Sequence, residues 1–102
     1  MRKQTSVHES IVIPQNKHLL LSIFSYLNDY HLCWEINQKF DINLSRLSDL
    51  RIIDHEIGVK IFSVYSYFSE TNKRNYTLIS NKSGNGPLVK ELPKVDFFLR
   101  IY

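Results

Sequence analysis

The chain is poor in the residues that usually build a site or a scaffold by themselves. Its 102 residues include one cysteine, Cys33, so no disulfide can form within the chain and we expect a free thiol in a reducing cytoplasm. Three glycines and three prolines exclude low-complexity or collagen-like sequence. The longest apolar runs, such as Leu19–Leu21, are too short to span a bilayer. No apolar stretch follows Met1–Lys3, so we expect no signal peptide.

The chain also lacks a concentrated charge. The formal net charge is +3, and the basic residues are scattered, with only Arg2-Lys3 and Lys73-Arg74 adjacent. Nucleic-acid binders usually gather their basic residues on one face or one helix. The composition therefore permits weak attraction to nucleic acid without requiring it.

The sequence does contain enough apolar residues for one core. Hydrophobic residues make up 43% and aromatic residues 13% of the chain, which is typical of a folded globular domain. A chain of this length forms one domain. We expect a flexible N-terminal segment over residues 1–17, in which Ile11-Val12-Ile13-Pro14 can form a short edge strand, and a single domain over residues 18–102.

A strand and a helix are predicted at the start of this domain. Leu19 to Tyr26 is apolar on both alternating faces, which is typical of a strand covered on both sides. Asn28-Asp29 then provides an N-cap for a helix that continues to about Phe40. Taken at 100° per residue, the core-facing side of this helix holds Leu32, Cys33, Ile36 and Phe40.

The helix has more apolar surface than this side can bury. Tyr30 and Trp34 lie four residues apart on a flank, so we expect another segment to cover Trp34. The next stretch, Asp41 to Asp49, carries Leu44 and Leu47 among polar residues. It can form an irregular arm or one helical turn that folds back over Trp34.

The remaining chain reads as strands joined by short turns. These short connections imply antiparallel pairing, and one helix on such a sheet predicts an α+β, two-layer sandwich of about five strands in the order β-α-β-β-β-β. The glycine of His55-Glu56-Ile57-Gly58 suits a tight hairpin. The expected strands are Arg51–Asp54, Val59–Phe68, Tyr76–Ser80 and a last one from Val95, with a polar turn at Glu70–Asn75 and a loop at Asn81–Pro87.

One motif resembles a known family. From Val89 the sequence reads Val-Lys-Glu-Leu-Pro-Lys-Val-Asp-Phe, which resembles the Ile-Pro-Glu-x-x-x-Val-Asp-Tyr motif of the small bacterial IPExxxVDY family. Glu91, Val95 and Asp96 match, Val89 and Phe97 are conservative replacements, and a lysine replaces the motif proline.

The resemblance continues upstream of the motif. The stretch Asp29–Trp34 is similar to the family's helix start, and Tyr76–Lys82 is similar to its strand before the loop, so the resemblance spans roughly residues 22–101. The family has no assigned activity. The resemblance therefore implies one compact domain and no site.

The chain offers no convincing constellation for chemistry. Glu91 and Asp96 are five residues apart, which sends them to opposite faces of an extended chain, and we expect them to fix the loop by accepting backbone N–H bonds. His31 and Glu35 share a helix face but make only two ligands. The run Lys82–Pro87 does not open a helix, as a phosphate loop would. We therefore expect no catalytic residues, no cofactor and no metal.

Two functions remain open for a chain without catalytic residues. The first is a protein–protein module, most simply a homodimer, because one helix cannot cover both apolar faces of the sheet. The second is RNA or single-stranded nucleic-acid binding through an aromatic sheet face. For the first we predict an interface on the second face of the sheet, with Tyr65, Tyr67 or Phe98 at or near its centre, and Trp34 on the helix as a further candidate interface residue.

Overall fold

The computed structural model describes residues 5–13 and 18–102. It confirms the α+β fold class, with a mainly antiparallel sheet and, within these residues, one helix. The elements in chain order are β1 (Thr5–Ile13), β2 (His18–Ser25), α1 (Asp29–Phe40), β3 (Ser45–Arg46), β4 (Leu50–Asp54), β5 (Gly58–Phe62), β6 (Val64–Ser69), β7 (Arg74–Ser80) and β8 (Phe97–Ile101).

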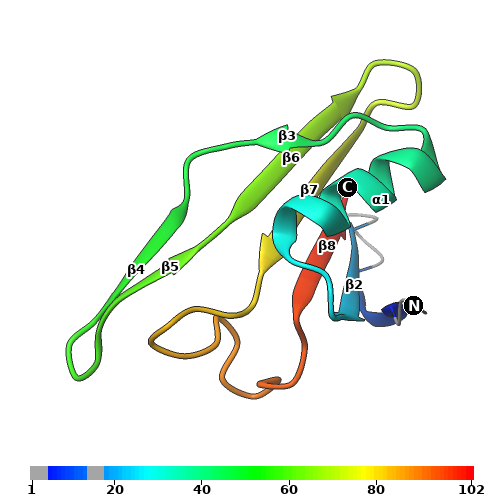
Figure 1. Ribbon diagram of the computed structural model, residues 1–102. Helices are drawn as coiled ribbons and strands as arrows, with labels where there is room; N and C mark the ends of the chain where they lie inside the picture. Colours follow the sequence, from blue (N-terminus) through cyan, green and yellow to red (C-terminus); the bar gives the residue numbers. More distant parts are fainter. Residues whose placement is uncertain (1–4, 14–17) are drawn as a thin grey trace.

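Six of these strands form the main sheet, in the order β1-β2-β8-β7-β6-β3, and every pair in it is antiparallel. The C-terminal strand β8 lies at the centre, between β2 and β7, because the connection from β7 brings it back beside its own predecessor. Helix α1 lies across one face of this sheet (Figure 1). The molecule is therefore two layers thick, with a shortest dimension of 24 Å.

The edge strand β1 falls in the segment expected to be flexible. Residues 5–13 pair with β2 along its length, with a register irregularity between Glu9 and Ile11. The flexibility of residues 1–17 stays a prediction, and Pro14 lies outside the described residues.

Helix α1 begins and ends at recognisable caps. The side-chain oxygen of the N-cap Asn28 accepts the His31 N–H at 2.8 Å, as predicted, and Asp41 takes a left-handed conformation (φ 53°) as C-cap. Burial of Leu32, Cys33 and Ile36 confirms the core-facing side, but Phe40 is 57% exposed and was wrongly predicted as buried. The chain turns away at Asp41, and Ile42 packs against the core in place of Phe40.

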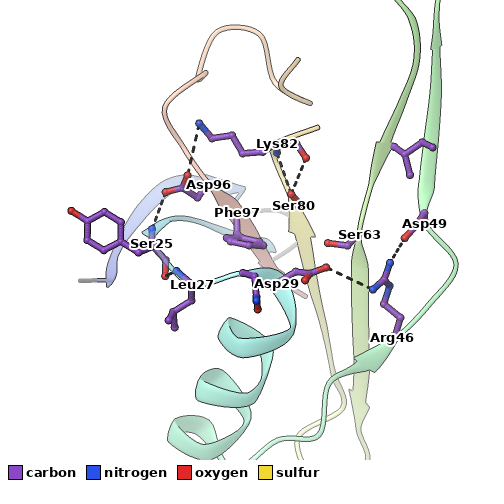
Figure 2. A pocket seen from close by; sticks show the side chains of 13 residues that line it. Ser25, Leu27, Asp29, Arg46, Asp49, Ser63, Ser80, Lys82, Asp96 and Phe97 are labelled. Carbon is purple, nitrogen blue, oxygen red and sulfur yellow. Dashed lines mark hydrogen bonds and ion pairs between the residues drawn. The ribbon is translucent and has the colours of Figure 1, made fainter. Parts of the chain in front are cut away.

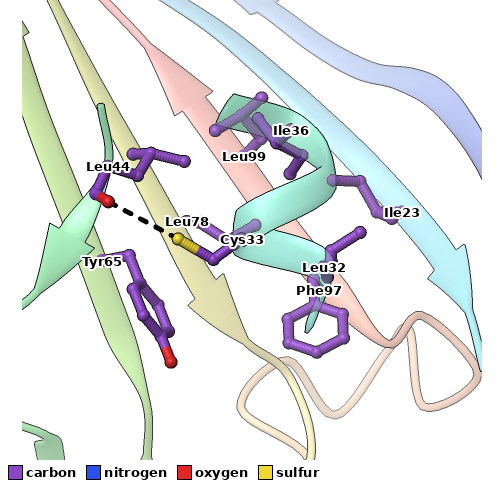
Figure 3. Close-up of a cluster of buried hydrophobic side chains, with 9 residues drawn as sticks. All are labelled: Ile23, Leu32, Cys33, Ile36, Leu44, Tyr65, Leu78, Phe97 and Leu99. Atoms are coloured by element: carbon purple, nitrogen blue, oxygen red, sulfur yellow. Dashed lines mark hydrogen bonds between the residues drawn. The ribbon is translucent and has the colours of Figure 1, made fainter. Parts of the chain in front are cut away.

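The core lies between α1 and the inner face of the sheet (Figure 3). Register explains its membership: Tyr65 pairs with Leu78, and Leu78 pairs with Leu99, so these side chains form one row on the helix side. Leu44, on the chain that leaves the helix, closes this core next to Cys33. The buried members are Ile23, Leu32, Cys33, Ile36, Leu44, Tyr65, Leu78, Phe97 and Leu99.

The stretch Val59–Phe68, predicted as one strand, is divided between two sheets. Its second half is β6, in the main sheet, whereas its first half belongs to β5, which pairs only with β4 among the described strands. The division comes from the segment that pairs with this stretch. Arg46 pairs with Tyr65, but Leu50 pairs with Phe62. Three residues, 47–49, therefore lie opposite only two, 63 and 64. One extra residue forms a bulge there, and the pairing chain bows outward between β3 and β4 (Figure 1).

The result is a hairpin that projects from the body, which we call the arm (Leu50–Phe62). In Figure 1 the arm extends past the end of the helix and of the main sheet. The radius of gyration is 13.9 Å, somewhat above the value of about 13 Å for a compact chain of this length. The tight turn at Gly58, with φ 118°, confirms the predicted hairpin.

Candidate interaction surface

The four side chains predicted to form an interface do not lie together. Tyr65 is 7% exposed and lies in the core under the helix, where burial raises the pKa of its hydroxyl. Tyr67 is half-buried on the same face, against Tyr76. Phe98 is on the opposite face and is only 4% exposed. The expectation that these three share one open face is corrected, because sheet alternation separates Phe98 from the two tyrosines.

The second face of the sheet is also less apolar than predicted. Register places Ser22 beside Phe98, and it places Thr77 between Ser66 and Arg100. Small polar and charged side chains therefore interrupt the apolar ones on this face. The predicted continuous apolar patch is absent from the part of this face that the structure describes.

Trp34 is the one predicted interface residue that is exposed, at 54%. The expectation that the following segment covers it is wrong. Residues 41–49 form no helical turn: they include the short strand β3, and they contribute Leu44 to the core on the Cys33 side of the helix. Trp34 follows Cys33 by 100° on the helix and points outward.

Asn37 explains this path and was missed in the sequence analysis. Its side chain bonds the Leu44 backbone twice, accepting the N–H at 2.8 Å and donating to the carbonyl at 3.1 Å. The Cys33 thiol approaches the same carbonyl at 3.6 Å. Burial raises the pKa of this thiol, which keeps it protonated and unreactive. The sequence feature that could have indicated this role is the position of Asn37, a polar residue next to the core-facing side of the helix.

Among the side chains that the structure describes, the largest cluster of exposed aliphatic residues is on the arm. Register places Arg51 opposite Ile61 and Ile53 opposite Val59, so these four residues share one side, which we call the outer face. Ile53 is 73% exposed, and Ile61 and Val59 are also exposed. The other exposed aliphatic residues of the arm are Leu50, Ile52 and Ile57.

On the opposite side of the arm, the β7–β8 connection contacts Lys60. Lys60 is 5% exposed, which is rare for a lysine unless it has partners. Its ammonium group donates to the Pro87 carbonyl at 3.4 Å and lies 3.8 Å from the Asp54 carboxylate. Asn85 adds a bond of 2.7 Å to the Val59 carbonyl. An isolated two-stranded hairpin is marginal in water, so these contacts hold the arm in place.

Asp54 also shapes the tip of the arm. Its carboxylate accepts the N–H groups of Glu56 and Ile57 at 2.9 and 3.1 Å. These two bonds, more than the nearby Lys60, hold the pKa of Asp54 below its ordinary value. The stretch Asp54-His55-Glu56 thus lies in a polar turn that the Asp54 carboxylate holds.

A pocket of about 510 Å³ lies where the arm meets the body. Figure 2 shows its charged side chains in two groups: Lys82 faces Asp96, and Arg46 faces Asp29 and Asp49. The closest of these pairs is Arg46 with Asp49 at 2.6 Å, and this bond raises the pKa of the guanidinium. Both cations have carboxylate partners within the pocket, and the third carboxylate leaves its lining with a formal charge of −1.

The motif residues hold the connection between β7 and β8. Asp96 accepts the Ser25 N–H at 2.8 Å, which confirms its predicted role as a backbone acceptor. Val95 and Phe97 are buried, whereas Glu91 is exposed on the loop. Val89 donates its N–H to the side-chain oxygen of Asn81 at 2.9 Å.

Asn81 is the residue that organises this connection, and the sequence analysis did not single it out. It is fully buried, and its side-chain nitrogen donates to the carbonyls of Leu92 and Val95, both at 2.8 Å. Its backbone bonds Asp96 and Leu88. One asparagine thus connects both ends of the loop. In the sequence, this role is indicated only by the position of a polar side chain directly after an apolar strand.

Among the side chains that the structure describes, no three histidine, cysteine or acidic residues gather as metal ligands. In the same residues no helix has the length and apolar character that a membrane crossing requires.

Comparison with known proteins adds no relative. No family model, no curated protein and no solved structure matches this chain.

Proposed function

We propose that this protein is a small, non-catalytic protein–protein interaction module and that the arm carries the interaction. The observation that supports this most directly is the outer face, where Ile53, Val59 and Ile61 adjoin one another and are exposed to solvent. Monomers rarely leave contiguous apolar patches beyond a few hundred Å² in water. The patch also lies on a projecting element, which a partner can reach without displacing the body.

The contacts on the other side of the arm support the same proposal. Lys60 and Asn85 fix the arm to the β7–β8 connection, so the outer face is presented in a defined orientation. A preorganised surface loses less entropy on binding than a mobile one. The homodimer predicted from the sequence is retained here, but its surface moves from the sheet to the arm.

Photo-crosslinking tests the proposal. A benzophenone amino acid is placed at Val59, on the outer face, and the matched control carries it at Thr71, an exposed residue in the β6–β7 turn. We expect Val59 to capture a protein, either a second copy or another chain, under conditions where Thr71 captures none. The captured partner is then purified and its affinity is measured.

The affinity measurement decides the outcome. Ile53→Lys is expected to weaken binding more than tenfold because it places a charge in the apolar patch. Thr71→Lys should change it less than twofold. Equal capture at both positions, or a captured partner indifferent to Ile53→Lys, contradicts the proposal, and capture of nucleic acid by Val59 supports the alternative function instead.

Two further assignments are proposals of the same kind. Membership of the IPExxxVDY family rests on the motif from Val89 to Phe97, of which Asp96 accepts the Ser25 N–H and Val89 donates to Asn81. A reducing, cytoplasmic location is supported by the single free thiol of Cys33.

A further inference from the structure

The direction of the backbone groups on the arm follows from its hydrogen bonds. The Val59 carbonyl accepts from Asn85 and the Ser63 carbonyl accepts from Ser80, so residues 59, 61 and 63 direct their backbone groups away from β4. In an antiparallel pair, such residues face partners that also point outward. The partners of Val59 and Ile61 are Ile53 and Arg51.

The outer edge of β4 therefore presents four backbone groups, the N–H and C=O of Arg51 and Ile53. Among the described strands only β5 pairs with β4, and it does so on the other edge. Such an edge is a template for another strand, and proteins usually protect it with charge, proline or a covering segment. Here the flanking side chains are mainly aliphatic.

We propose that the partner of the arm is a second copy of this chain, paired antiparallel through β4 about a twofold axis at Ile52. This inference rests on the proposed function and specifies its partner. With Ile52 opposite Ile52 of the second copy, Arg51 lies opposite Ile53 in both directions. The strand is thus complementary to itself, as a twofold interface requires.

This register satisfies every outward group of the edge. Each Arg51–Ile53 pair exchanges two backbone bonds, so all four groups of each copy are used. On the outer face the Arg51 stem covers Ile53 of the second copy, and the two guanidinium groups, which lie diagonally across the axis, extend apart into solvent. On the other face the two Ile52 side chains meet at the axis.

The size of the contact sets the expected affinity. Stable interfaces bury about 800 Å² on each partner, and pairing between two five-residue strands buries less. We therefore expect a micromolar dimer rather than an obligate one. The bulge at residues 48–49 ends the pairing, so the tip of each arm lies beside the base of the other.

Disulfide trapping at the axis is the sharpest test. Residues at a non-hydrogen-bonded antiparallel pair have Cα atoms about 4.5 Å apart, within the range a disulfide spans. Ile52→Cys should form a covalent dimer under mild oxidation. Leu50→Cys is the matched control, because Leu50 has the same face and nearly the same exposure, 37% against 36%, but lies two residues from the axis.

A second variant distinguishes loss of pairing at the β4 edge from loss of folding. Ile53→Pro removes one outward N–H without removing a β4–β5 bond. We expect it to remain folded by circular dichroism and to be monomeric by sedimentation at concentrations where the unchanged chain dimerises.

Two results overturn the proposal. One is a chain that stays monomeric at every concentration with no Ile52→Cys dimer, and the other is equal crosslinking of both cysteine variants. If Val59 still captures a different protein in either case, the interaction function stands and only the second copy is wrong. If it captures nothing, both fail.

Discussion

One continuous stretch of chain, from Gly58 to Ser69, serves two different parts of the molecule. Its second half is β6, where Tyr65 lies under the helix and Val64 faces the other side of the main sheet. Its first half is β5, where Lys60 and Phe62 are buried but Val59 and Ile61 are exposed. The same apolar alternation is thus covered in one half and open in the other.

The difference comes from neighbours. β6 has β7 on one side and β3 on the other, and α1 covers its inner face. β5 has β4 on one side, with single side chains such as Asn85 on the other. An alternating apolar pattern therefore indicates a surface that is favourable to bury. Whether another segment of the same chain buries it depends on the tertiary contacts of the strand.

The largest effect should come from the covered half. Leu78→Ala removes a side chain that is fully buried opposite Tyr65 and should cost ~2–5 kcal/mol of unfolding free energy. Ile53→Ala, at 73% exposure, should change it by less than ~0.5 kcal/mol. Urea unfolding of the monomer followed by circular dichroism measures both. Equal losses would mean that the arm is as buried as the body.

Two asparagines on the same connection sharpen the contrast. Asn81→Ala leaves two carbonyls and one N–H without their side-chain partner and should cost roughly 2–4 kcal/mol globally. Asn85→Ala removes only the bond to Val59 and should cost about 1 kcal/mol or less. Amide exchange locates each effect: Asn81→Ala should speed exchange in β8, and Asn85→Ala only in the arm. Faster exchange in β8 from Asn85→Ala would contradict this division.

Shortening the arm should be tolerated by the body. Replacing Arg51–Ile61 with Asn-Gly joins Leu50 and Phe62, which already pair, through a two-residue hairpin turn. We expect a folded chain that loses less than ~2 kcal/mol, since a lone hairpin contributes little. It should also lose all self-association in sedimentation. A body that unfolds without the arm would show that the two regions form one cooperative unit.

The smallest expected effect is a titration at the tip of the arm. The pKa of Asp54 is held below its ordinary value of 3.8 by the N–H groups of Glu56 and Ile57. Its contribution is therefore complete above this ordinary value and is lost as the pH falls through the depressed pKa. Amide shifts of Glu56 and Ile57 should follow this titration and vanish as a pH response in Asp54→Asn. Simultaneous titration of β8 amides would contradict a local effect.

Local sequence signals predicted the elements well. The Asn28 cap placed the helix start, and Gly58 placed the hairpin, because both act within a few residues. The Asp96 interpretation was also correct, since a carboxylate beside a loop usually accepts backbone bonds.

The sequence did not predict the features that depend on contacts between residues far apart in the chain. Ser63 is the point where one predicted strand passes from one sheet to the other. The cause is the extra residue in the segment that pairs with it, which the sequence of the strand does not show. Asn81 depends on the carbonyls of Leu92 and Val95, which are far along the chain. The interface prediction failed for the same reason, because the register of β8 against β7 determines which face holds Phe98.

The single thiol of Cys33 can report how often the core opens. Cys33 is buried at the point where α1 meets the backbone of Leu44, so a thiol reagent reaches it only when that junction parts. Its labelling rate under native conditions measures how often the body opens, without any substitution in the chain. Fraying of the arm should leave this rate unchanged, because the Leu44 carbonyl and the Asn37 amide, which contact the sulfur, both lie outside the arm.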